Sequence, residues 1–131
     1  MTRHNIRILV VDDFSTMRRI IRGILRELGF NNIIEADDGV TAWPLIEKGD
    51  FDLIVTDWNM PKMSGYELLC KIRASEQFSA LPVLMVTAET KREQIITAAK
   101  AGVNGYIIKP FTTESLKEKI DKIFERIDRA A

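Results

Sequence analysis

Residues 8–13 read Ile-Leu-Val-Val-Asp-Asp, an uninterrupted apolar run that ends in two carboxylates. Four aliphatic residues in a row, without polar alternation, are typical of a strand that is buried on both faces. Similar short apolar runs follow along the chain, and amphipathic stretches separate them. This alternation predicts an α/β fold in which a five-stranded parallel sheet carries helices on both faces. The predicted strands are residues 8–11, 33–36, 53–56, 83–86 and 106–108.

The first and last predicted helices are the most clearly patterned. In the first, six apolar residues recur at helical spacing, and Gly29 follows in a place suited to end the helix. Arginines occupy its other face, which we interpret as solvated surface. The last helix repeats this pattern, with Thr112 or Thr113 available as its N-cap. The apolar positions are Met17, Ile20, Ile21, Ile24, Leu25 and Leu28 in the first helix and Leu116, Ile120, Ile123, Phe124 and Ile127 in the last.

Two of the middle helices are less regular. The helix predicted for residues 39–48 contains Pro44, which lacks an N–H group and crowds the preceding turn, so we expect a kink or a late start. The helix predicted for residues 91–101 has Ile95 and Ile96 side by side. Neighbouring helical residues do not share a face. At least one of these two isoleucines should therefore lie near the surface.

The composition is that of an ordinary globular protein. The 131 residues are 46% hydrophobic and 29% charged, which favours a single domain over residues 1–131 with one hydrophobic core. Basic and acidic residues number 19 each, so there is no bulk attraction to nucleic acid. No long apolar segment follows residues 1–5, and we expect neither a signal peptide nor a membrane span but a cytoplasmic location. Cys70 is the sole cysteine and is predicted to be a small core residue.

Reactive side chains follow four of the five predicted strands. Asp12 and Asp13 follow the first strand, Asp57 the third, Thr87 the fourth and Lys109 the fifth. In open α/β sheets, ligands bind outside the carboxyl ends of the strands. The order of the sequence therefore predicts one pocket that contains three carboxylates, a hydroxyl and an ammonium group.

The predicted cluster of carboxylates requires positive charge. Two carboxylates about 4 Å apart repel each other by roughly 4 kcal/mol at an effective dielectric near 20. Lys109 supplies one positive charge, and a divalent metal would supply more. A site made of oxygen ligands, without histidine or cysteine, suits Mg²⁺ and disfavours zinc. Such a site can stabilise a transferring phosphoryl group, with one carboxylate as the nucleophile.

Four short segments carry a family resemblance. Val-Val-Asp-Asp at 10–13, Asp-Trp-Asn-Met-Pro at 57–61, Val-Thr-Ala at 86–88 and Lys-Pro-Phe at 109–111 resemble the signature segments of bacterial two-component response-regulator receiver domains. The match covers nearly the whole chain. Within that family, the sequence is most similar to the single-domain chemotaxis regulators. The resemblance implies a flavodoxin-like receiver fold with strand order 2-1-3-4-5 and no output domain.

The resemblance also implies roles for the acidic residues and the acceptor loop. Asp57 would be the phosphorylated residue. The Mg²⁺ ligands would be Asp13, Asp57 and the backbone carbonyl of Asn59, with Asp12 acting through water. Ser64 stands where the family commonly has aspartate, and a serine can still cap the following helix.

Three further residues acquire roles from the same resemblance. Lys109 would pair with the acceptor and later with the phosphoryl oxygens, and the Lys109–Pro110 bond would be cis. Thr87 would move to hydrogen-bond the phosphoryl group. Tyr106 would turn inward as Thr87 moves, so that these two residues form the switch.

The expected output face combines the helix from Lys91, the strand from Tyr106 and the helix from Thr113. An apolar centre with a basic rim suits an amphipathic acidic helix as its partner. The family resemblance implies that this helix belongs to the flagellar motor switch protein FliM and that the chemotaxis histidine kinase CheA is the phosphodonor. A CheZ-type phosphatase is a further partner that the resemblance allows, and a monomer is expected. The predicted face consists of Lys91, Ile95, Ala99, Tyr106, Lys119 and Lys122.

An aspartyl-nucleophile phosphatase is the strongest alternative, because such enzymes also place Mg²⁺, lysine and a hydroxyl at strand ends. Many of them carry a second aspartate two residues after the nucleophile as the general acid and base. Here that position is Asn59, which cannot take a proton from water. We therefore interpret the chain as a phospho-accepting switch and not as an enzyme that turns over a substrate.

Two non-enzymatic functions compete with the motor-binding switch. A flavin-binding module would hold a phosphate in the loop after the first strand, but Asp12 and Asp13 would repel it. A colourless purified protein would exclude this class. A single-domain phosphorelay intermediate would use the same acidic site and differ only in its partner.

Overall fold

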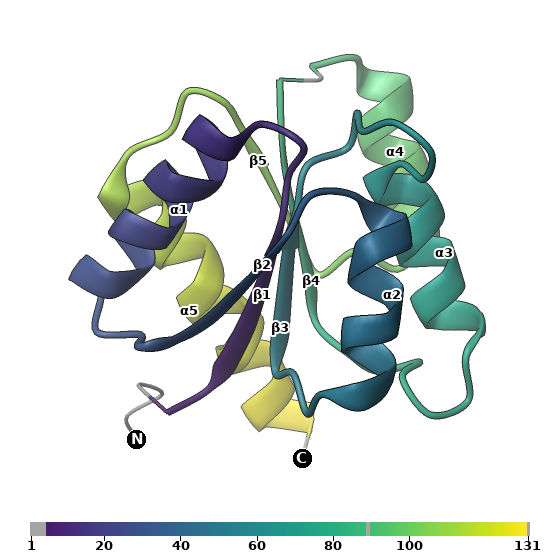
Figure 1. Cartoon of the computed structure of the whole chain (residues 1–131), viewed down its shortest axis with the longest axis horizontal. Coiled ribbons are helices and arrows are strands. Elements are labelled where there is room, and N and C mark those ends of the chain that lie inside the picture. The colour runs from purple at the N-terminus through teal and green to yellow at the C-terminus, as the bar shows by residue number, and fades with distance from the viewer. Residues whose placement is uncertain (1–4, 89, 131) are drawn as a thin grey trace.

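The computed structural model describes residues 5–88 and 90–130. Within them, five strands alternate with five helices along the chain (Figure 1). The strands are β1 (Arg7–Val11), β2 (Asn32–Ala36), β3 (Leu53–Thr56), β4 (Val83–Thr87) and β5 (Gly105–Ile108). The helices are α1 (Ser15–Glu27), α2 (Gly39–Lys48), α3 (Gly65–Ala74), α4 (Arg92–Lys100) and α5 (Thr113–Ala130).

The strands form one parallel sheet in the order β2-β1-β3-β4-β5, which confirms the predicted fold. Figure 1 shows α1 and α5 on one face of the sheet and α2, α3 and α4 on the other. The strand order reverses direction between β1 and β3, and the carboxyl ends of these two strands flank the usual ligand crevice of such folds. The sheet therefore presents Asp12 and Asp57, the residues that directly follow β1 and β3, at the same edge.

The core has two layers, one on each face of the sheet. Successive strand residues point to opposite faces. Accordingly, Ile8 and Val10 pack toward α1 and α5, whereas Leu9 and Val11 pack toward α2 and α3. All four side chains are at most 1% exposed. The uninterrupted apolar sequence of β1 follows from this burial on both faces.

Helix α1 departs from the prediction in two ways. Ile20 is 48% exposed, because at 100° per residue it lies about 90° from the centre of the stripe that its apolar neighbours form. The arginine face is also not simply solvated. Arg18 Nε and Arg22 Nη1 lie 3.2 and 2.7 Å from the two carboxylate oxygens of Glu35 on β2, so these arginines tie α1 to the edge of the sheet.

Helix α2 begins at Gly39, which excludes the late start, while the alternative of a kink at Pro44 stays a prediction. Asp38 and Thr41 cap its amino end reciprocally, with the Thr41 N–H donating to Asp38 Oδ1 over 2.9 Å. Pro44 lies in the interior of the helix and removes one N–H that would bond to the carbonyl of Val40. Val40 is 46% exposed.

Helix α4 is the least buried of the helices in residues 5–88 and 90–130. Ile95 and Ile96 are 36% and 41% exposed, and Ala98 is the one buried residue of this helix. We predicted that at least one of these isoleucines lies at the surface, and the structure confirms this because both of them do. Helix α4 thus presents aliphatic side chains to the solvent.

The structure corrects the interpretation of Cys70 and decides between the candidate caps of α5. Cys70 is only half-buried. Leu68, Leu69 and Ile72 face the sheet, and Cys70 lies roughly 150° around the helix from their centre. At the start of α5, Thr112 is the cap, because its Oγ1 accepts a hydrogen bond from the Ser115 N–H over 3.0 Å.

The helices are too short or too polar to cross a membrane. None of those in residues 5–88 and 90–130 combines the length and the apolar character that a membrane span requires.

Candidate acidic site at the carboxyl ends of the strands

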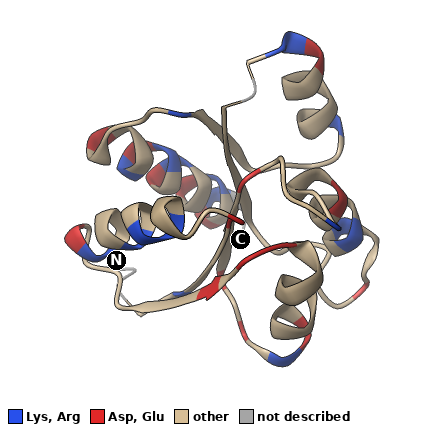
Figure 2. Cartoon of the chain, turned by 45° about the horizontal axis from the view of Figure 1, so that its top comes forward, with Lys and Arg blue, Asp and Glu red and all other residues tan. Residues whose placement is uncertain are grey.

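The predicted acidic residues converge at the carboxyl edge of the sheet. Figure 2 turns this edge toward the viewer, and acidic segments lie near the centre while most basic residues lie on the helices. Carboxylate oxygens of Asp12, Asp13 and Asp57 all lie within 4.8 Å of one another. Lys109 reaches the same cluster, with Nζ 3.3 Å from Asp12 Oδ2 and 3.5 Å from Asp57 Oδ2. The structure therefore brings together the three carboxylates and the ammonium group that the sequence indicates.

The chain holds two of the carboxylates through backbone bonds. Asp12 is 1% exposed, and its Oδ1 accepts a hydrogen bond from the Phe14 N–H over 2.9 Å. Its carbonyl oxygen accepts from Arg18 Nη1. Asp57 Oδ1 accepts from the Trp58 N–H over 2.8 Å, and the Asp57 N–H donates to the Val11 carbonyl over 2.9 Å. The remaining oxygen of each carboxylate faces Lys109.

The donor set fits a hard divalent cation. Three carboxylates and one ammonium group sum to a formal charge of −2. Asp13 is exposed whereas Asp12 is buried, so the cluster opens to solvent on one side. Oxygen ligands at an open site, with room for several waters, match the preference of Mg²⁺.

Burial also perturbs the acceptor candidate. Desolvation raises the pKa of the Asp57 carboxyl above its ordinary value, and the charge of Asp12 adds to this effect. The Lys109 ammonium and the Trp58 N–H oppose the rise in pKa. Because the pKa is higher in the folded protein than in the unfolded chain, ionised Asp57 lowers stability at neutral pH.

This shift gives a prediction for Asp57→Asn in metal-free buffer. At about pH 7 the variant should be more stable than the wild type. Its free energy of unfolding should be higher by more than the roughly 0.5 kcal/mol typical of surface substitutions. At low pH the Asp57 side chain is protonated in both the folded and the unfolded protein. The difference in stability between the variant and the wild type should therefore shrink toward about pH 3. Urea denaturation with a chelator at both pH values measures it. A wild type that is the more stable protein at neutral pH would contradict the assignment.

Gly65 lets the acceptor loop close, although its sequence context does not mark it as a site residue. Its N–H donates to the Trp58 carbonyl over 2.8 Å. A Cβ atom at this position would lie 1.9 Å from the Asp57 carbonyl oxygen. The adjacent Ser64 caps α3, with its hydroxyl accepting from the Glu67 N–H over 3.1 Å, which confirms the expectation for Ser64. No local sequence signal marks this approach, because it joins a helix start to a strand end.

Gly65→Ala should therefore displace the Asp57 backbone and lower the free energy of unfolding by about 1–3 kcal/mol, as overpacking does. Gly23→Ala is the matched control, because no heavy atom lies within 4 Å of the added Cβ on α1. A glycine in a helix interior costs stability relative to alanine, so this control should be as stable as the wild type or more stable. Urea denaturation compares the two variants. Equal stabilities would argue against the close approach at Gly65.

The predicted switch residues lie on β4 and β5, the two strands that follow β3 in the sheet. Thr87 ends β4 and is fully buried. Tyr106 on β5 is half-buried and packs on the face of the sheet opposite to Ile107. Its ring lies edge-on to Trp58 with centroids 6.4 Å apart, and Trp58 stacks on Tyr66 at 5.4 Å. Local sequence patterns do not reveal this aromatic chain.

The remaining predicted residues are spread around the site and the adjacent edge strand. Asn59 is exposed in the loop after Asp57, and the Lys109–Pro110 bond is cis as expected. Lys91, Ile95 and Ala99 are exposed around α4, Lys119 is half-buried on α5, and Lys122 is exposed there with Nζ 3.1 Å from Glu118 Oε1.

Comparisons with known proteins match this geometry. A model of the response regulator receiver domain matches residues 8–121. Chemotaxis protein CheY-3 of Vibrio cholerae serotype O1 is 69% identical over 123 residues, which cover 94% of this chain and 95% of that protein. Chemotaxis protein CheY of Pseudomonas aeruginosa is 66% identical over 122 residues, with coverages of 93% and 98%. A similar solved structure is the receiver domain of the sensor histidine kinase PA1611 from Pseudomonas aeruginosa PAO1. It superposes with a TM-score of 0.80 at 29% identity and covers 91% of this chain and 98% of that domain. That structure has a magnesium ion coordinated in the active site cleft.

Proposed function

The chain belongs to the response regulator receiver domain family, and on this premise we propose that it is a chemotaxis switch that accepts a phosphoryl group on Asp57. The observation that carries the proposal is the convergence of Asp12, Asp13 and Asp57 with Lys109 at one sheet edge. We further propose that residues 1–131 act as a single receiver domain. The signal then leaves through contact with another protein in the cytoplasm.

Phosphoryl transfer requires little of the protein beyond a positioned nucleophile and balanced charge. A carboxylate oxygen of Asp57 attacks the phosphorus atom of a phosphohistidine, and the phosphorus–nitrogen bond breaks as the histidine leaves. Lys109 already lies 3.5 Å from Asp57 Oδ2 and neutralises charge on the phosphoryl oxygens. Mg²⁺ held by Asp13, Asp57 and the backbone carbonyl of Asn59, with Asp12 acting through water, would supply the rest of the charge stabilisation.

The acyl phosphate should persist long enough to signal. Its hydrolysis needs a group that removes a proton from the attacking water. The residue two positions after the acceptor is Asn59, and an amide cannot perform this step. The proposed protein is therefore a switch that assists its own phosphorylation and is dephosphorylated slowly, unless a CheZ-type phosphatase supplies the missing group.

The switch couples the phosphoryl charge to α4, β5 and α5. Phosphorylation adds roughly −1.5 to −2 charge, which attracts the hydroxyl of Thr87 at the buried end of β4. Tyr106 pairs in register with Met85, two residues before Thr87, so its ring can follow into the space that Thr87 leaves. The change in shape is local and needs no movement of the sheet.

The proposed partner surface surrounds Tyr106. Exposed Ile95 and Ala99 supply an apolar centre on α4, and Lys91, Lys119 and Lys122 supply a basic rim. An amphipathic acidic helix is complementary to such a surface. The names of the chemotaxis relatives support the flagellar motor switch protein FliM as the owner of that helix and a chemotaxis histidine kinase, CheA, as the phosphodonor.

The proposed function is tested by titrating an N-terminal motor-switch peptide into the protein with Mg²⁺, in the presence and absence of beryllofluoride. Beryllofluoride mimics the phosphoryl group, so we expect at least fivefold tighter binding in its presence, a coupling of about 1 kcal/mol. Tyr106→Ala and Lys119→Glu should each reduce the affinity of the activated protein. Lys48→Glu, an exposed charge change at the far end of α2, should not. Equal affinity in both states would place the output surface elsewhere.

A further inference from the structure

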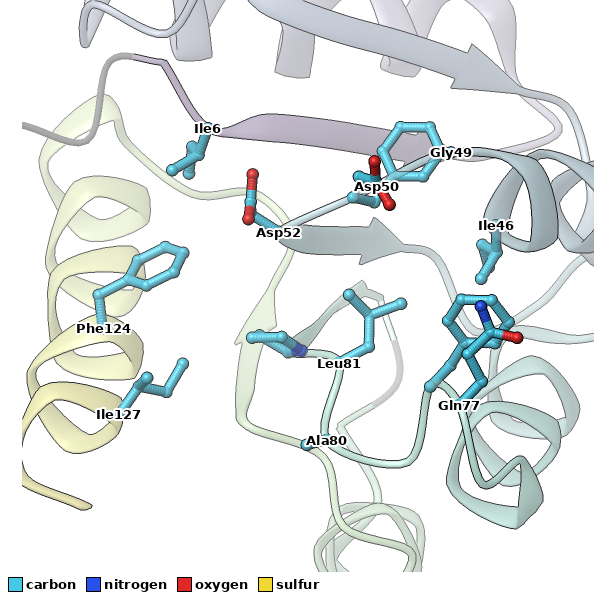
Figure 3. A pocket seen from close by; sticks show the side chains of 13 residues that line it. Ile6, Ile46, Gly49, Asp50, Asp52, Gln77, Ala80, Leu81, Phe124 and Ile127 are labelled. Carbon is cyan, nitrogen blue, oxygen red and sulfur yellow. The ribbon is translucent and has the colours of Figure 1, made fainter. Parts of the chain in front are cut away.

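A cavity of about 800 Å³ lies at the amino ends of the strands, at the opposite edge of the sheet from the acidic site (Figure 3). Its walls come from the chain before β1, the loop between α2 and β3, the loop between α3 and β4, and the last turns of α5. Strand β3 separates Asp52 from Asp57, so the cavity lies roughly 16 Å from the acceptor. The lining residues that matter for binding are Asp50, Asp52, Leu81, Phe124 and Ile127.

The wall between α3 and β4 is held by backbone and side-chain hydrogen bonds. Arg73 Nη1 donates to the carbonyl oxygens of Ser79 and Leu81, over 3.2 and 2.6 Å. The Leu81 N–H donates to the Phe78 carbonyl, and the Pro82 carbonyl accepts from the Ile54 N–H, both over 2.9 Å. A wall fixed in this way is pre-formed, which is usual for sites that bind small molecules.

The cavity combines an apolar interior with carboxylates on one side. Figure 3 shows Leu81, Phe124 and Ile127 around the opening, with Asp50 and Asp52 on neighbouring parts of the wall. No lysine or arginine lines it among the described residues. Arg7 lies beside this wall, with its guanidinium 4.8 Å from the centre of the Phe51 ring.

The carboxylates keep capacity for a bound cation. Asp52 Oδ2 accepts a hydrogen bond from the Arg7 N–H over 2.8 Å, and an ionised carboxylate offers about four acceptor positions. Asp50 is exposed and lies two residues earlier on the same wall. A positive charge beside both residues would still leave the half-buried side chains of Phe78, Leu81 and Ile127 available for an apolar group.

We propose that this cavity binds a small amphipathic organic cation, with its apolar body on Leu81, Phe124 and Ile127 and its ammonium group beside Asp50 and Asp52. The volume lies within the range of about 300–1,000 Å³ that is typical of small-molecule pockets. The site is separate from the phosphoryl site and does not depend on the proposed function. Apolar contact supplies affinity, and the carboxylates select cations over anions of the same shape.

Titration with 2-phenylethylamine, 2-phenylethanol and 3-phenylpropionate tests this assignment, with amide shifts followed by NMR and excess Mg²⁺ present. The amine should shift residues 77–81 and 124–127 saturably and bind at least fivefold more tightly than the anion. Asp50→Asn should weaken amine binding at least threefold and leave the neutral alcohol unchanged. Glu47→Gln, an exposed carboxylate on α2 outside the cavity, should have no effect.

A second variant keeps the test independent of charge. Ala80→Trp adds bulk at an exposed position of the cavity wall and should abolish the shifts caused by both the amine and the alcohol. Equal affinities for the amine and the carboxylate would overturn the proposal. So would amine-induced shifts confined to residues around Asp57, or amine binding that Asp50→Asn leaves unchanged.

Discussion

Asparagine in place of Asp57 should reduce phosphoryl incorporation from acetyl phosphate by about 100-fold or more. An amide nitrogen or oxygen is a poor nucleophile, and nucleophilic catalysis is lost when the attacking group is removed. Asp12 cannot replace it readily, because its side chain is 1% exposed whereas that of Asp57 is 12% exposed. Intact-protein mass spectrometry after incubation with the donor and Mg²⁺ measures the incorporation.

The matched control for this experiment is Glu47→Gln, which removes an exposed carboxylate on α2 outside the acidic cluster. It should be labelled like the wild type. Labelling of Asp57→Asn at more than a tenth of the wild-type level would mean that another residue accepts the phosphoryl group.

Asp13→Asn should weaken Mg²⁺ binding at least tenfold. Removing one full charge about 4 Å from a cation costs a few kcal/mol at an effective dielectric near 20, and about 1.4 kcal/mol already equals a factor of ten in affinity. Trp58 can report the binding, because it directly follows Asp57 and its backbone N–H donates to Asp57 Oδ1. We expect Mg²⁺ to quench its fluorescence.

Trp43 adds background fluorescence, so both proteins in this comparison should carry Trp43→Phe. The side chain of Trp43 packs against Phe78 with centroids 6.1 Å apart and does not belong to the acidic cluster. A Mg²⁺ titration curve that is the same with and without Asp13 would remove this residue from the ligand set.

Most of the fold follows from the sequence because all five strands are short runs rich in aliphatic residues. Burial of β1, β3 and β4 on both faces leaves no polar alternation in them, and this pattern is hard to confuse with an exposed helix. The errors concern side chains at the margin of a face. Helical spacing assigns Ile20 to the apolar stripe of α1, although it projects from the edge of that stripe. The arginines of α1 have partners on β2 that local patterns do not reveal.

The acidic site is predictable for a different reason. Parallel strands bring their carboxyl ends to one edge of the sheet, so Asp12, Asp57 and Lys109 have to converge once the strands are identified. The close approach of Gly65 to Asp57 and the stacking of Trp58 on Tyr66 depend on how one loop folds. The cavity beside Asp50 is not predictable either, because it is assembled from four segments far apart in the sequence.

The most direct test of the central claim is to locate the phosphoryl group in the wild-type protein. The protein is incubated with acetyl phosphate and Mg²⁺, digested under conditions that preserve acyl phosphates, and mapped by tandem mass spectrometry, with a parallel sample in a metal chelator. We predict one phosphoryl group, on Asp57, in the Mg²⁺ sample and almost none in the chelated sample. Modification of a different residue, or equal modification of Asp57 without the metal, would contradict the account.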